Sequence, residues 1–127
     1  MNVMDASALL AFLFKEQGHE AAGRLLDGSL ISAVNFSEVV GRFVRDGHDA
    51  RTVEDRLCTL RMKIEPFGQQ DATIAAELLP ATLPLGLSLA DRACLALALR
   101  KKLPAVTADR AWGSLDLAVP IKLIRGS

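Results

Sequence analysis

The sequence predicts a three-layer α/β/α sandwich built on a mainly parallel sheet of four to five strands. Short apolar runs typical of buried strands alternate with segments whose apolar residues recur every three to four positions, as on one face of a helix. Hydrophobic residues make up 50% of the 127 positions, which is enough for one packed domain. We therefore expect a single domain over residues 1–127, with helices covering both faces of the sheet.

The expected elements follow from these patterns in chain order. Strands are expected at residues 2–4, 30–34, 63–67, 105–107 and 121–124. Helices are expected at residues 6–15, 19–27, from Phe36 to the residue before Gly47, 49–61, 70–79 and 89–99. The strand 63–67 contains Pro66, which donates nothing to a ladder and indicates an edge strand. Pro80, Pro84 and Gly86 predict a loop between the last two helices.

The last expected helix differs from the others in its composition. Residues 89–99 are apolar on almost all sides, which predicts a helix buried between neighbouring elements. Arg100, Lys101 and Lys102 follow it and are expected to form a solvated helix end, where positive charge is favourable.

Composition limits the possible partners and the cellular setting. Fifteen basic and fifteen acidic residues balance, so a nucleic acid would have to be met by a local basic patch or through metal ions. No apolar run approaches the ~18 residues that a membrane span needs, and the N-terminus has no signal pattern. Cys58 and Cys94 lack a C-x-x-C spacing and are interpreted as buried free thiols. We expect a cytoplasmic protein without a membrane partner.

Four acidic residues stand where a strand ends or a helix begins: Asp5, Glu38, Asp91 and Asp109. In a parallel sheet these positions lie at one edge, where ligands bind. A helix-capping role is the alternative for the first three, and an ordinary turn at Asp109-Arg110 is the alternative for the fourth. Asp5 could be a helix N-cap, and Asn35-x-x-Glu38 and Ser88-x-x-Asp91 both match a capping box.

Carboxylates that converge at one edge repel one another unless cations neutralise them. Mg²⁺, for which Mn²⁺ can substitute, is the natural partner of oxygen ligands, and no His/Cys cluster suggests zinc. Bound in this way, such ions activate a water for phosphodiester cleavage. The pattern therefore favours a metal-dependent hydrolase.

At these positions the chain resembles the PIN-domain family, and within it the VapC toxins of bacterial toxin–antitoxin pairs. The matching segments lie in family order at residues 3–9, 37–39, 87–98 and 106–112. The resemblance implies a metal-dependent endoribonuclease acting on tRNA, rRNA or mRNA. It places Asp5, Glu38, Asp91 and Asp109 on the metal-binding acids, and Ser7 and Thr107 on hydroxyl positions beside them. It also implies a VapB-type antitoxin as partner, and a homodimer.

Our hypothesis is RNA hydrolysis by a metal-activated water held by the clustered carboxylates. Arg92 and Arg110 are candidates for substrate phosphates, or else form ion pairs with their acidic neighbours. Two other functions stay open: a non-catalytic module that binds RNA or protein and uses its acids as caps, and a phosphatase with Asp5 as nucleophile. The phosphatase is disfavoured because no lysine follows an expected strand as that chemistry requires.

Overall fold

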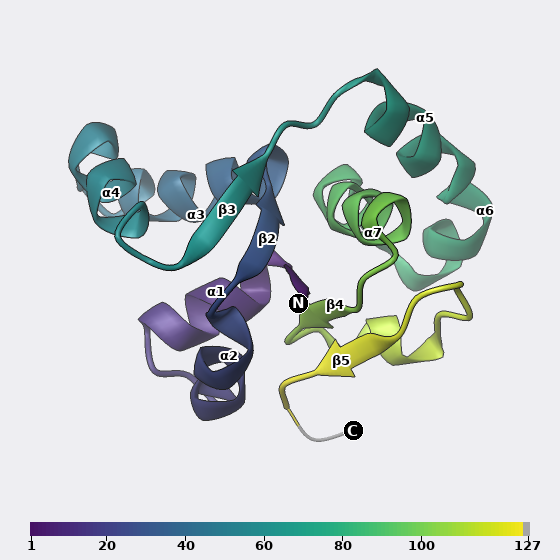
Figure 1. Ribbon diagram of the computed structural model, residues 1–127, viewed down its shortest axis with the longest axis horizontal. Coiled ribbons are helices and arrows are strands. Elements are labelled where there is room, and N and C mark those ends of the chain that lie inside the picture. Colours follow the sequence, from purple (N-terminus) through teal and green to yellow (C-terminus); the bar gives the residue numbers. More distant parts are fainter. Residues whose placement is uncertain (126–127) are drawn as a thin grey trace.

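The computed structural model of the protein describes residues 1–125 (Figure 1). One parallel sheet of five strands has the order β3-β2-β1-β4-β5. Its strands are β1 (Val3–Met4), β2 (Ser29–Ser32), β3 (Met62–Glu65), β4 (Ala105–Thr107) and β5 (Ile121–Leu123). The helices are α1 (Ala6–Leu13), α2 (His19–Leu26), α3 (Ala33–Arg45), α4 (Ala50–Leu57), α5 (Gln69–Glu77), α6 (Leu79–Thr82) and α7 (Leu89–Lys101), with 3₁₀ turns η1 (Leu83–Leu85) and η2 (Arg110–Ser114). The expected sandwich is confirmed, and β3 is an edge strand.

Two hydrophobic clusters, one on each face of the sheet, account for the uninterrupted apolar strands. Side chains of successive strand residues point to opposite faces, and accordingly Met4 packs in one cluster while Val3 packs in the other. Helices α1 to α4 cover the Met4 face, and α7 with the α5–α6 segment covers the Val3 face (Figure 1). The strands read as continuous apolar runs because both of their faces are covered.

Helix α3 begins earlier than the sequence pattern indicated. The Ser32 hydroxyl accepts a hydrogen bond from the Val34 N–H at 3.2 Å and caps the helix, so the last expected strand residues already belong to α3. Asn35 is therefore inside the helix, and the expected Asn35-x-x-Glu38 capping box is wrong. Glu38 lies in the second turn rather than the first.

The segment after α5 is helical where a loop was expected. Pro80 stands in the first turn of α6 and Pro84 in the first turn of η1. In the first turn of a helix the backbone N–H groups have no acceptor within the helix. Proline, which lacks this N–H, therefore loses no hydrogen bond there and is tolerated. The prolines begin short helical turns here instead of excluding them.

Helix α7 is buried as expected, and its first turn carries the Ser88–Asp91 capping box. At its C-terminal end Lys101 and Lys102 are exposed, as expected, whereas Arg100 is only partly exposed. Arg100 forms an ion pair with both carboxylate oxygens of Asp71 on α5, whose side chain is only 2% exposed. Lys101 lies 3.4 Å from the carboxylate of Glu65, at the end of β3. This end of α7 thus joins α5 and the sheet edge.

Two composition-based expectations have different outcomes. Cys94 is a buried free thiol as expected, whereas Cys58 is exposed because it caps the C-terminal end of α4. Among residues 1–125 we find no helix that combines the length and hydrophobicity needed to cross a bilayer.

The Asp71–Arg100 pair is expected to be a main contact between α5 and α7. Substituting Arg100→Gln leaves the Asp71 carboxylate buried without its counter-charge, and should lower the free energy of unfolding by roughly 2–4 kcal/mol in urea titrations. The matched control is Arg24→Gln on α2. The Arg24 side chain is exposed and forms no ion pair within residues 1–125. It should change stability by less than about 0.5 kcal/mol. Equal effects of the two substitutions would contradict this role.

Candidate functional site

The Asp5 side chain lies buried at the end of β1, near the middle of the sheet, and is 3% exposed. Its backbone N–H donates to the Val106 carbonyl of β4 at 2.8 Å and so continues the strand ladder. Asp5 occupies the N-cap position of α1, yet its carboxylate makes no capping hydrogen bond. The carboxylate is therefore turned to a different set of partners.

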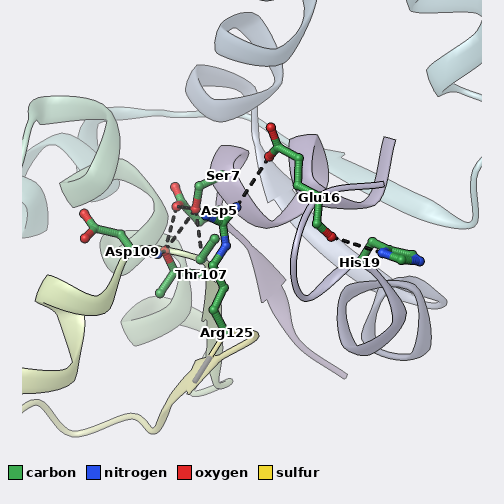
Figure 2. A network of polar contacts seen from close by, with 8 residues as sticks. Asp5, Ser7, Glu16, His19, Thr107, Asp109 and Arg125 are labelled. Atoms are coloured by element: carbon green, nitrogen blue, oxygen red, sulfur yellow. Dashed lines mark hydrogen bonds and ion pairs between the residues drawn. The ribbon is translucent and has the colours of Figure 1, made fainter. Parts of the chain in front are cut away.

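Two hydroxyl groups hold one oxygen of this carboxylate (Figure 2). Ser7 Oγ donates to Asp5 Oδ2 at 2.6 Å, and Thr107 Oγ1 donates to the same oxygen at 2.9 Å. The backbone N–H groups of Ala108 and Asp109 in turn donate to these two hydroxyls, at 2.9 and 3.1 Å. Within residues 1–125 Asp5 Oδ1 accepts no hydrogen bond, so it is the oxygen available to a ligand.

Glu38 approaches the same place from α3. Its Oε1 accepts a hydrogen bond from Asn35 Nδ2 at 3.1 Å. Asn35 is fully buried, and its Nδ2 also donates to the Ala90 carbonyl in the first turn of α7 at 3.0 Å. A single amide thus connects the Glu38 carboxylate to the helix that carries Asp91. The sequence pattern missed this role because it identified Asn35 as a helix cap.

Asp91 completes the group from the first turn of α7. Its Oδ2 accepts the Ser88 N–H at 2.9 Å as part of the capping box. Capping occupies only one of its two carboxylate oxygens, so the capping role leaves room for a second role. The expected choice between cap and site does not arise for this residue.

Asp5, Glu38 and Asp91 line one open pocket of about 450 Å³ together with Ser7, Leu10, Arg42 and Arg45. Each of the three carboxylates has one oxygen that accepts no hydrogen bond from residues 1–125: Oδ1 of Asp5, Oε2 of Glu38 and Oδ1 of Asp91. The structure therefore brings together three of the four acids that the sequence singled out.

Two of these acids, Asp5 and Glu38, have a raised pKa. The pKa of Asp5 is raised to about 6, mainly by burial; the hydrogen bonds from Ser7 and Thr107 oppose this rise, and the negative charges of Asp91 and Glu38 add to it. Partial burial and the charge of Asp91 raise the pKa of Glu38 as well. Burial and the negative charges of the same three carboxylates also raise the pKa of the Cys94 thiol. Ionisation of Asp5 and Glu38 is thus less favourable here than in water.

The donor set fits a hard divalent cation. All available groups are carboxylate oxygens, as Mg²⁺ and Mn²⁺ require, and their uncompensated charge favours a cation. Within residues 1–125, no three Asp, Glu, His or Cys side chains are already close enough together to bind a metal ion. Binding an ion would therefore have to draw the three carboxylates closer together.

Asp109 stands apart from the other three acids. Its Oδ1 accepts the Ala111 N–H at 3.0 Å and caps η2, and the side chain does not line the pocket. Figure 2 shows its carboxylate directed away from that of Asp5. Asp116 is exposed and likewise does not line the pocket. Asp109 contributes to the site through its backbone N–H on Thr107.

The arginines in the pocket are not the two that the sequence singled out. Arg92 is partly buried, and its Nε has no hydrogen-bond partner within residues 1–125. Arg110 is exposed on η2, and neither arginine lines the pocket. Arg42 and Arg45 of α3 line it instead. Their spacing of four and seven residues from Glu38, which places all three on one helix face, is the signal that could have identified them.

Comparisons with known proteins agree on the fold. The chain matches the PIN domain family model over residues 3–117. Similar solved structures include VapBC2 from Rickettsia felis bound to a promoter DNA fragment, with 13% identity, a TM-score of 0.73, and 95% of this chain and 96% of that chain covered. VapC20 from Mycobacterium tuberculosis, described as a sarcin–ricin-loop-cleaving toxin, has 17% identity and a TM-score of 0.69, with coverage of 91% and 97%. VapBC-5 from the same organism, a member of the VapBC family of toxin–antitoxin systems, has 25% identity and a TM-score of 0.61, with 98% of both chains covered. A search of the curated proteins gives no match.

The raised pKa of Asp5 predicts a characteristic pH dependence of stability. Asp5 binds its proton more tightly in the folded chain, so it favours folding most at low pH and opposes it as the pH rises from about 4 through about 6. In EDTA, Asp5→Asn should raise the free energy of unfolding by roughly 2–3 kcal/mol at pH 8 and change it little near pH 4. Urea titrations at several pH values measure this difference, and a gain that does not vary with pH would refute the assignment.

Proposed function

Because the chain belongs to the PIN domain family, we propose that it is a Mg²⁺-dependent endoribonuclease and the toxin of a VapBC-type toxin–antitoxin pair. The observation that carries the proposal is the pocket itself. Asp5, Glu38 and Asp91 come from three separate segments of the chain and line the same open pocket, and each carboxylate has one oxygen that accepts no hydrogen bond from residues 1–125. Caps alone have no reason to gather in this way.

In this proposal Asp5, Glu38 and Asp91 hold Mg²⁺, or Mn²⁺ in its place. The bound ion supplies an activated water and stabilises negative charge on the phosphate. Ser7 and Thr107 fix Oδ2 of Asp5, so that Oδ1 remains the binding oxygen. Asp109 supports the site from its rim, through its backbone N–H on Thr107.

The neighbouring carboxylates of Glu38 and Asp91 are held by Asn35 Nδ2 and the Ser88 N–H. These donors fix one oxygen of each group and so limit the rotation of the side chain. The chain's own contribution is thus to keep three negative groups together that would otherwise repel one another.

A phosphatase with Asp5 as nucleophile receives no support from the site. The residues that line the pocket within the described part of the chain include no lysine. In the binding-module alternative, Asp5, Glu38 and Asp91 serve as helix caps. Within residues 1–125, Asp91 is the only one of these three that makes a capping hydrogen bond.

A partner protein is part of the proposal. Similar solved structures include toxin–antitoxin assemblies, among them a complex from Klebsiella pneumoniae with 17% identity and a TM-score of 0.71. This chain has an apolar pocket of about 450 Å³ that is lined mainly by Leu13, Phe43, Val53, Leu57 and Leu60, between α1, α3 and α4. Such a surface favours a protein ligand. We propose a VapB-type antitoxin as partner and a homodimer as the assembly.

Cleavage assays test the enzymatic part. Wild-type protein should cleave total RNA with Mg²⁺ or Mn²⁺ and not with EDTA. Asp5→Asn, Glu38→Gln and Asp91→Asn should each reduce the rate on the order of a hundredfold or more, since each removes a charge that holds the ion. Asp109→Asn should reduce it less.

The control is Asp116→Asn, an exposed acid outside the pocket that should leave the rate unchanged. Full Mg²⁺-dependent cleavage by Asp5→Asn would show that the site is wrongly assigned. A wild-type protein that neither cleaves RNA nor binds Mn²⁺ in calorimetry would favour the binding module.

The partner proposal has its own test. The product of the neighbouring open reading frame, co-purified with this chain, should suppress its RNA cleavage at a stoichiometric ratio. Analytical ultracentrifugation of the free chain should give the mass of a dimer. Undiminished cleavage in the presence of the bound neighbour would argue against an antitoxin.

A further inference from the structure

One wall of the acidic pocket carries positive charge. Arg42 and Arg45 follow Glu38 on α3 by four and seven residues, and all three line the pocket. At 1.5 Å per residue, the two arginines start about 6 and about 10 Å along the helix axis from Glu38. The α3 wall thus changes from acidic to basic over roughly two turns.

Neither guanidinium is neutralised by the acids of the pocket. The Arg42 Nε lies 3.4 Å from Asp46 Oδ2, one turn further along α3, and its guanidinium lies over the Phe14 ring at 4.8 Å from the centroid. In residues 1–125 the ion pairs do not include Arg45. Both side chains are therefore placed beside the carboxylates and remain available to an anion.

Arg42 is also restrained in position. Phe14 stacks on Phe43 with ring centroids 5.2 Å apart, which gives the cation–π contact a fixed support. A partly immobilised guanidinium loses less side-chain entropy when it binds a phosphate. Arg45 is exposed, and within residues 1–125 its guanidinium takes part in no ion pair or cation–π contact.

Charge balance shows why a polyanion needs this wall. Three ionised carboxylates with one divalent ion keep a net negative charge, which repels RNA phosphates. Arg42, whose Nε pairs with Asp46 rather than with a pocket acid, and Arg45, which forms no ion pair within residues 1–125, add positive charge on the α3 side of the pocket only. The substrate backbone is then attracted along one direction, away from Glu38 and toward Arg45.

Building on the proposed ribonuclease function, we propose that Arg42 and Arg45 bind the backbone phosphates that flank the scissile phosphodiester. The RNA strand runs along α3, with the cleaved bond at the three carboxylates and the adjoining phosphates at the two guanidinium groups. Arginine suits this role because its planar group donates two parallel hydrogen bonds to a phosphate. Such contacts position the strand and carry no base specificity.

The salt dependence of RNA binding tests the inference. In an Asp5→Asn background that silences cleavage, the affinity for a fluorescent single-stranded oligonucleotide is measured by anisotropy from 50 to 300 mM NaCl. Each of Arg42→Gln and Arg45→Gln should lower the slope of log K against log salt by about 0.7 and weaken binding about fivefold at 0.1 M salt. The loss should be equal for adenine-rich and uracil-rich strands.

Two controls make the result specific. Arg24→Gln removes an exposed arginine from α2, outside the pocket, and should leave the slope unchanged. Arg42→Lys retains the charge and should restore most of the slope, whereas a loss caused by altered packing would remain. Thermal unfolding checks that every variant is folded.

The outcomes separate this inference from the proposed function. Slopes for Arg42→Gln and Arg45→Gln that match Arg24→Gln overturn it, even if the wild type cleaves RNA. Reduced slopes support it as a phosphate-binding surface, even if the wild type does not cleave. Failure of cleavage alone therefore counts against the nuclease proposal and leaves this one standing.

Discussion

A buried carboxylate at the end of a central strand is the constraint on which the rest of this site depends. The parallel register pairs Met4 with Val106, and the next residues along the two strands are Asp5 and Thr107. Strand pairing therefore delivers the Thr107 hydroxyl to the Asp5 carboxylate at 2.9 Å. The first turn of α1 adds the Ser7 hydroxyl on the same oxygen. Sheet geometry, which is set by the two hydrophobic clusters, thus decides which oxygen of Asp5 stays available.

The other two acids depend on how α3 and α7 pack together. Asn35 donates both to Glu38 and to the Ala90 carbonyl, so the relative position of the two helices and the orientation of Glu38 are linked. Within residues 1–125 the Asn35 Oδ1 is buried without a hydrogen-bond partner, which is a cost to stability. The two hydrogen bonds donated by its Nδ2 oppose this cost and hold the Glu38 carboxylate. The hydrogen bonds of Asn35 thus contribute both to the packing of α3 against α7 and to the geometry of the site.

The charged side chains on the Val3 face form ion pairs that stabilise the fold, whereas those at the pocket remain available for binding. On the Val3 face, Asp71 is compensated by Arg100, and Glu65 lies near Lys101. Three carboxylates and two arginines line the pocket. Within the described residues they form no ion pairs with one another. Uncompensated charge lowers the stability of the free protein and is characteristic of functional sites. The contrast between the two regions supports the pocket as the place where ligands bind.

The sequence by itself determined the layered fold and placed Asp5 at the end of a strand and Asp91 at the start of a helix, because hydrophobic periodicity and strand–helix boundaries are local features. It placed Glu38 at the correct edge of the sheet, but in the first turn of the following helix rather than in the second turn of α3. Both Ser32 and Asn35 are residue types that could cap this helix, and in the folded chain the cap is Ser32. Tertiary structure alone decided three matters: that Asp109 caps η2, that Arg42 and Arg45 enter the pocket, and that Arg100 pairs with Asp71. Each depends on side-chain direction and on contacts between distant segments, which no local pattern encodes.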